Sequence, residues 1–234
     1  SAGIRAATGD IIALVDSDNI LDSPEWLNRM IAPFDDPDIV ATEPLWYTRR
    51  DSDPALTRYF AMLGMNDPIC LFLGNYDRRS MITGQWTGLE VNTQEFPSYL
   101  KLRLDAGNLP TIGANGFVIR RRLLEKVVWE PYFFDIDIMQ QAAAAGLNTV
   151  AKVKCGIVHL YCGRLRDFAR KQDRRVSDYL FFAGERQRRY PWSRQRRSGI
   201  LRFCLSTALV VPLLFQIAKG WRRCRDGAWL YHLP

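Results

Sequence analysis

Residues 10–19 read Asp10-Ile11-Ile12-Ala13-Leu14-Val15-Asp16-Ser17-Asp18-Asn19, an apolar run that leads directly into two carboxylates. The run lacks the alternation of a half-exposed strand, which predicts a buried strand of a parallel sheet. Ligands of open α/β sheets gather at the carboxyl ends of such strands. We therefore expect Asp16 and Asp18 to lie beside a cation and a phosphorylated ligand. Their oxygen-only, acidic character suits Mg²⁺ or Mn²⁺ shared with substrate phosphates.

A calcium loop and a capping turn also use closely spaced aspartates. An EF-hand calcium loop would continue with an acidic or amide residue and then Gly, so Ile20 and Leu21 exclude it. A capping turn before the next helix stays open, although Ser23 and Pro24 already supply an N-cap and a first helical residue. On the residues alone, the metal site and the capping turn carry equal weight.

Composition is that of a globular protein with one sizeable core. The 234 residues are 47% hydrophobic and 24% charged. The five cysteines are odd in number and lack metal-type spacing, which favours a reduced, cytosol-facing environment. Residues 1–9 are neither apolar nor led by Met, so no signal peptide is expected, and the chain is expected to begin partway through a longer protein.

The net charge of +7 is unevenly distributed. Residues 1–163 carry 15 Lys and Arg against 20 Asp and Glu, a net of −5, whereas residues 164–234 carry 17 against 5, a net of +12. Such a basic region attracts anions. No nucleic-acid motif accompanies it, so we expect an anionic membrane surface as the partner and no nucleic acid.

The membrane prediction rests on the apolar segment 203–218. It has 16 residues, whereas a comfortable span takes about 20, so a transmembrane helix, an interfacial helix and a buried core helix all compete. Basic and aromatic residues on both sides favour a membrane-embedded or interfacial helix. The flanking aromatic residues are Trp192, Trp221, Trp229 and Tyr231.

The rest of the chain predicts an α/β fold with a mostly parallel sheet and flanking helices. We expect a catalytic domain over residues 1–185, within which residues 65–109 form an insertion that covers the active site or touches lipid. Residues 186–234 would be a basic, membrane-associated segment. Expected helices cover residues 24–33, 54–64, 121–127 and 139–145, and expected strands cover residues 39–42 and 149–153.

The loop Gly113-Ala114-Asn115-Gly116 precedes a short apolar strand. Its glycines would let the backbone approach a ligand closely, which makes Gly113 and Asn115 candidates for ligand binding. A tight turn that needs positive φ explains the same residues equally well.

Two further aspartates begin an expected helix. Asp135 follows Phe133 and Phe134, so it could act as a general base in a cleft where aromatic rings limit water. Stabilisation of the helix N-terminus is the alternative. Asp135 and Asp137 point to different faces of a helix, so we do not expect them to share a proton.

His159 and a basic helix follow. A lone His at a strand end is more often a core residue, but it could complete a metal site begun by Asp18. Residues 170–175 read Arg-Lys-Gln-Asp-Arg-Arg and suit clamping a diphosphate leaving group, or form a solvated basic face.

The order of these motifs resembles the family 2 glycosyltransferases of GT-A, Rossmann-like fold, over residues 1–180. The resemblance implies that Asp16 contacts a nucleotide-diphosphate sugar and that Asp18 holds the divalent metal. It also implies that Asp135 is the catalytic base and that His159 matches a metal-coordinating His of some members. The matching motifs are Asp16-Ser17-Asp18, Gly113-Ala114-Asn115-Gly116, Phe134-Asp135 eleven residues ahead of Gly146, and His159.

The sequence departs from this family at two places. Gln172, Arg174 and Arg175 are loosely similar to the Gln/Arg/Trp motif of processive synthases, but Val176 stands where the Trp is expected, which puts polymerising activity in doubt. Members also begin with a strand bearing a Pro-x-Tyr/Phe-Asn-Glu-like segment, which nothing before Asp10 supplies. The resemblance thus implies a chain incomplete at its N-terminus and cut before further C-terminal membrane helices.

We therefore expect metal-dependent, inverting transfer of a sugar to a lipid-linked or glycan acceptor at a membrane, with the active site facing the cytoplasm. The alternative is a catalytically inactive, membrane-associated binding or assembly module that lacks the donor-binding half.

Overall fold

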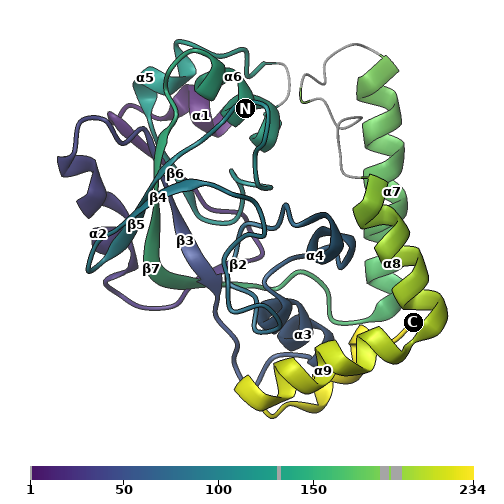
Figure 1. The fold of residues 1–234 in the computed structure, drawn as a ribbon. Helices are drawn as coiled ribbons and strands as arrows, with labels where there is room; N and C mark the ends of the chain where they lie inside the picture. The colour runs from purple at the N-terminus through teal and green to yellow at the C-terminus, as the bar shows by residue number, and fades with distance from the viewer. Residues whose placement is uncertain (1, 131–132, 185–189, 191–196) are drawn as a thin grey trace. The chain divides into compact units, whose positions relative to one another are not determined.

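The structure is a computed structural model that describes residues 2–130, 133–184, 190 and 197–234. The chain forms two compact units, which are described separately (Figure 1). Unit 1 comprises residues 1–45 and 89–157, and unit 2 comprises residues 46–88 and 158–234. The functional division expected between residues 185 and 186 stays a prediction.

Unit 1 is built on a seven-stranded sheet whose strand order is β1-β6-β3-β7-β5-β4, with β2 paired to β7 (Figure 1). The α/β class is confirmed, but the mostly parallel sheet is not, because β1–β6, β3–β6, β4–β5 and β5–β7 are antiparallel pairs. The strands are β1 (Ile11–Leu14), β2 (Asn19–Leu21), β3 (Ala41–Tyr47), β4 (Asn92–Glu95), β5 (Tyr99–Arg103), β6 (Phe117–Arg120) and β7 (Thr149–His159).

The strand β1 lies at one end of this order and, among the described residues, pairs with β6 alone and antiparallel to it, so the prediction of a buried, parallel strand was wrong. Within β1 only Ile12 is buried, opposite Ile119 of β6, whereas Ala13 is exposed. A short apolar run can predict that a strand forms, but it does not predict which strand will pair with it or in which direction.

Trp26 and Met30 of α2 belong to the buried hydrophobic core of unit 1. Trp26 is almost fully buried, and its Nε1 donates to the Gly156 carbonyl oxygen at 2.9 Å. The helix begins after Glu25 without a side-chain cap, so the N-cap expected at Ser23 was wrong. The helices of unit 1 are α1 (Ala2–Ala6), α2 (Trp26–Ile31), η1 (Ala32–Asp35), α5 (Arg121–Leu124) and α6 (Asp135–Ala144).

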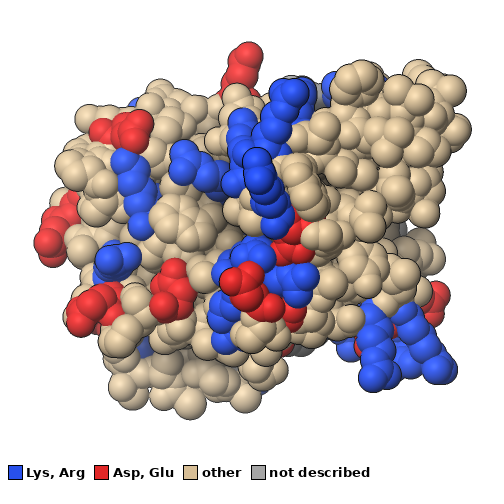
Figure 2. All heavy atoms as spheres, turned by 90° about the horizontal axis from the view of Figure 1, so that it is seen from below, with Lys and Arg blue, Asp and Glu red and all other residues tan. Residues whose placement is uncertain are grey.

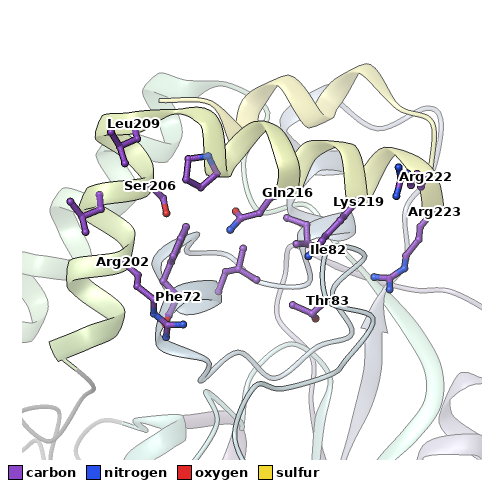
Figure 3. A pocket seen from close by; sticks show the side chains of 13 residues that line it. Phe72, Ile82, Thr83, Arg202, Ser206, Leu209, Gln216, Lys219, Arg222 and Arg223 are labelled. Atoms are coloured by element: carbon purple, nitrogen blue, oxygen red, sulfur yellow. The ribbon is translucent and has the colours of Figure 1, made fainter.

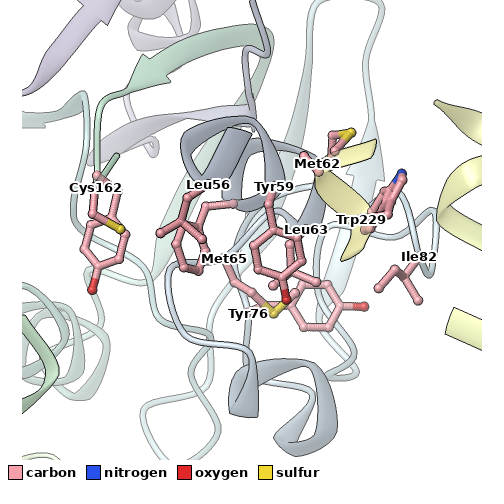
Figure 4. Close-up of a cluster of buried hydrophobic side chains, with 12 residues drawn as sticks. Leu56, Tyr59, Met62, Leu63, Met65, Tyr76, Ile82, Cys162 and Trp229 are labelled. Carbon is pink, nitrogen blue, oxygen red and sulfur yellow. The ribbon is translucent and has the colours of Figure 1, made fainter. Parts of the chain in front are cut away.

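Unit 2 is helical and has its own hydrophobic core around α3 (Figure 4). Gly64 ends α3 with a φ of 78°, as the sequence predicted. Its helices are α3 (Ala55–Leu63), α4 (Ile69–Leu73), α7 (Leu165–Gly184), α8 (Arg197–Leu209), α9 (Val211–Arg223) and η3 (Gly227–His232). The buried cluster contains Leu56, Tyr59, Phe60, Met62, Leu63, Met65, Tyr76, Ile82, Tyr161, Cys162, Ala228 and Trp229.

The apolar segment 203–218 is not one helix, because the helical backbone is interrupted at Val210, between α8 and α9. Only Ser206 and Leu213 are buried within it, so it is not a core helix. In the described ranges no single helix is long and apolar enough to cross a membrane, and α8 and α9 meet those criteria only together, bent by 94°. Trp192 and the rest of 191–196, like residues 185–189, lie outside the described residues.

The segment η3 is fastened to α3 by two buried polar groups. The Asp226 carboxylate accepts from Arg58 at 2.8 Å and from Arg49 at 2.7 Å, which lowers its pKa. His232 lies between the Tyr59 hydroxyl, 2.9 Å from Nδ1, and the Gln216 Oε1, 2.5 Å from Nε2. Burial lowers the pKa of His232 to about 4.

We predict that unfolding becomes easier as the pH falls below about 6.5, the ordinary pKa of His. The unfolded chain then binds a proton that folded His232 does not bind until about pH 4, so stability present above pH 6.5 is lost across this window. The full loss is on the order of 3 kcal/mol. Urea unfolding at several pH values measures the slope, and His232→Asn should flatten it. An unchanged slope in that variant would contradict the prediction.

Candidate functional site

A cavity of about 720 Å³ in unit 1 contains four of the predicted site residues. Asp16, Gly113, Asn115 and Asp135 all contribute to its wall, which brings together the end of β1, the loop before β6 and the start of α6. The complete lining is Gly3, Ile4, Ala7, Ile11, Ile12, Ala13, Leu14, Val15, Asp16, Gly113, Ala114, Asn115, Phe133 and Asp135.

Asp16 and Asp18 lie in a tight turn after β1. The Asn19 amide donates to the Asp16 carbonyl oxygen at 3.0 Å, and the Asp16 amide donates to the Asn19 Oδ1 at 3.3 Å. The turn leaves Asp16 exposed at the cavity, whereas Asp18 is half-buried and outside its lining. Neither is the N-cap of α2, which is Glu25, so helix capping does not account for them.

The same turn is tied to the glycine-containing loop. The Asn19 Nδ2 donates to the Asn115 Oδ1 at 3.1 Å. Asn115 is buried and has a φ of 55°, a left-handed conformation that Asn tolerates better than most residues. This side-chain pair therefore fixes the distance between the two loops that border the cavity.

Glu43, which the sequence reasoning missed, holds the other end of that loop. Its Oε1 accepts from the Gly113 amide at 3.0 Å, and its Oε2 lies 2.5 Å from the Lys152 Nζ. Both charged side chains are fully buried, on β3 and β7. A Glu and a Lys of opposite charge inside two mostly apolar strands were the available signal, because buried charges need partners.

Gly113 is the point at which the loop meets α6. Its φ is 120°, and a Cβ there would lie only 2.8 Å from the Asp135 Cβ, so no side chain fits. This glycine therefore serves both a turn with positive φ and a close approach of two backbones. Asp135 is the first residue of α6 and half-buried beside the cavity, whereas Asp137 is buried away from its lining.

Unit 2 holds the remaining candidates. His159 packs between the rings of Tyr47 and Tyr161, at centroid distances of 5.5 and 5.4 Å. Arg175 lies over the Tyr161 ring at 5.1 Å. Asp18 belongs to unit 1 and His159 to unit 2, so their shared metal site stays a prediction.

The basic helix α7 covers Tyr161 with cations. Lys171 lies 4.5 Å from its ring centroid, and burial raises the pKa of Tyr161 to about 12, against the opposing effect of Arg175. The Gln172 Nε2 is buried without a hydrogen-bond partner in the described part of the chain, and Arg174 is exposed. Guanidinium groups beside such amide donors suit phosphate oxygens.

The residues for a metal are few. Within the described ranges, no three His, Cys, Asp or Glu side chains are grouped to hold an ion. Mg²⁺ commonly takes only one or two protein carboxylates and completes its shell with water and substrate phosphates. The carboxylate oxygens of the Asp16–Asn19 turn fit that donor set.

A family model described as glycosyltransferase-like family 2 matches residues 1–177. The chain belongs to this family. The match includes the cavity in unit 1 and α7 as far as Val176 and Ser177. Family 2 glycosyltransferases transfer a sugar from a nucleotide-sugar donor, have the GT-A fold and typically use a divalent metal. No curated protein and no solved structure matches the chain.

We predict that Gly113→Ala lowers kcat/KM by about 100-fold, because the added methyl group must displace the start of α6. Gly146→Ala is the matched control, since Gly146 shares a positive φ of 84° but has no atom of the described residues within 4 Å of the added Cβ. Both variants should lose about 1–3 kcal/mol of stability from backbone strain. Thermal unfolding and steady-state kinetics measure the two effects, and equal kcat/KM values for the two variants would refute the steric effect.

Proposed function

We propose that this glycosyltransferase transfers a sugar from a nucleotide-diphosphate donor to an acceptor hydroxyl with inversion at the anomeric carbon. The proposal is carried by one observation, that Asp16, the Gly113 loop and Asp135 line a single cavity. A volume of about 720 Å³ lies in the usual range for small-molecule sites.

Asp135 is the proposed general base. Its carboxylate would take the proton from the acceptor hydroxyl as that oxygen bonds to the anomeric carbon. The bond from this carbon to the diphosphate oxygen breaks on the opposite side, and its electron pair leaves with the diphosphate. Phe133 belongs to the same wall and would limit water near the reacting atoms.

The donor would be held by Asp16 and by the loop that carries Gly113 and Asn115. Gly113 lines the cavity, so its backbone would lie against the bound nucleotide sugar. Gln172, Arg174 and Arg175 would provide donors and positive charge for the departing diphosphate.

The proposed metal ligand is Asp18, joined by His159. A bound Mg²⁺ or Mn²⁺ would supply positive charge that stabilises the diphosphate leaving group. We further propose a lipid-linked or glycan acceptor, at a membrane whose cytoplasmic side faces the active site. The five cysteines all lie in the described ranges and are not joined in disulfides there.

Asp135→Asn should lower kcat/KM by about 10²–10⁴-fold with a hydroxyl acceptor, because it removes the base. Donor affinity, measured by calorimetry, should stay unchanged. Asp10→Asn is the matched control, since Asp10 is exposed and outside the cavity lining. With an acceptor that is already anionic, such as a polyprenyl phosphate, the loss should be small. Full activity of Asp135→Asn on a hydroxyl acceptor would overturn the assignment.

Asp18→Ala should abolish the part of donor affinity that depends on Mn²⁺ or Mg²⁺. Calorimetric titration of the nucleotide sugar with and without the ion measures that part, and Asp38→Ala removes an exposed carboxylate outside the cavity lining as a control. Unchanged metal dependence in Asp18→Ala would reject its role. Absence of metal-dependent binding in the unaltered chain would favour the inactive binding module.

A further inference from the structure

The helices α8 and α9 of unit 2 leave an unusual amount of apolar surface uncovered. Leu209 is 63% exposed and Phe215 is 69% exposed, on either side of the break at Val210. Soluble proteins rarely expose large contiguous apolar patches unless something binds there. The other exposed apolar side chains of the pair are Ile200, Leu201, Leu205, Val211, Leu214 and Trp221.

The charge of this helix pair has one sign and lies away from the break. Residues 197–225 contain six basic residues and no acidic ones, and residues 203–218 contain no charge at all. Figure 2 shows one face of the molecule, on which Lys and Arg side chains form a band with some Asp and Glu side chains among them, beside a broad area without charged side chains. These six basic residues are Arg197, Arg202, Lys219, Arg222 and Arg223 in the two helices, and Arg225 just after α9.

The bend determines how far the pair can reach. Pro212 stands in the first turn of α9 and has no N–H, so α8 cannot continue straight through it. Each helix has 13 residues, or about 20 Å, and the two meet at 94°. Neither helix reaches across a hydrocarbon core of about 30 Å, so an inserted pair enters and leaves through the same leaflet.

A cavity of about 660 Å³ lies between the two helices, α4 and the loop of Ile82 and Thr83 (Figure 3). Four cations line it. The Arg202 Nη2 donates to the Phe72 carbonyl oxygen at 2.9 Å, and the Arg223 Nη1 donates to the Met81 carbonyl oxygen at 2.7 Å. These bonds anchor both guanidinium groups at the cavity wall, while Lys219 and Arg222 also line the cavity and are exposed.

From these observations we infer that the α8–α9 pair inserts its bend into one leaflet of an anionic bilayer, and that the basic cavity beneath it holds lipid phosphate groups. The apolar side chains near Val210 enter the acyl region, and the cations at the far ends stay at the level of the headgroups. A lipid is favoured over free phosphate because the same cavity is lined by Phe72, Leu205 and Leu209. The inference does not depend on the transfer reaction.

Flotation with vesicles of phosphatidylcholine, alone or mixed with phosphatidylglycerol, tests this inference without a sugar donor. The unaltered chain should bind the mixed vesicles and bind phosphatidylcholine weakly. Lys219→Gln/Arg222→Gln should lower affinity for the mixed vesicles by about 30-fold. Phe215→Ser should lower affinity for both vesicle types, since it removes inserted apolar surface.

The matched control is Arg166→Gln/Arg170→Gln, which removes the same charge from the exposed part of α7. Its affinity should fall far less, and an equal loss would overturn the cavity assignment in favour of net charge. Binding of inorganic phosphate without binding to vesicles would also overturn the inference. So would self-association in sedimentation that Phe215→Ser abolishes, because a second copy would then cover the apolar face.

Discussion

The cavity of unit 1 depends on the contacts that the buried Glu43 carboxylate makes with Lys152 and with the loop that carries Gly113. The Glu43 side chain is fully buried, and the Lys152 ammonium and the Gly113 amide replace the water molecules that would otherwise solvate its carboxylate. Such a pair adds little stability relative to apolar side chains of the same size, but loss of one partner typically costs about 3–5 kcal/mol. Its effect is therefore specific: it binds two strands of the sheet and one loop in a single arrangement.

These contacts also position the residues of unit 1 that are predicted to bind the nucleotide sugar, which are Asp16, Gly113 and Asn115. Glu43 fixes the Gly113 amide, and the bare Cα of Gly113 lets the first turn of α6 come close. At the other end of the loop, Asn115 holds Asn19 and with it the turn that follows β1. Two carboxylates from distant parts of the sequence thus reach one cavity through contacts made mostly by backbone and amide groups. The chain belongs to the glycosyltransferase-like family 2, and the proposed transfer reaction is assigned to this cavity.

The sequence predicted the local elements better than their pairing. Residues 11–14 form a strand, the strand expected over 149–153 forms and continues to residue 159, and Gly64 ends α3, because apolar runs and left-handed glycines act locally. The parallel sheet was wrong, since hydrophobicity does not encode strand direction. The helix expected over residues 203–218 is broken, although Pro212 was a visible signal. Glu43 was missed because its partners lie 70 and 109 residues away in the chain.

The contact between Gly220 and Trp229 has a mechanical consequence. A Cβ on Gly220 would lie 2.5 Å from the indole ring, so α9 rests directly against η3. The same short segment is fastened to α3 through His232 and Asp226. A force applied to α9 is therefore transmitted through η3 to the hydrophobic core of unit 2. If α9 binds to a surface, unit 2 should therefore tilt together with α9 as one body.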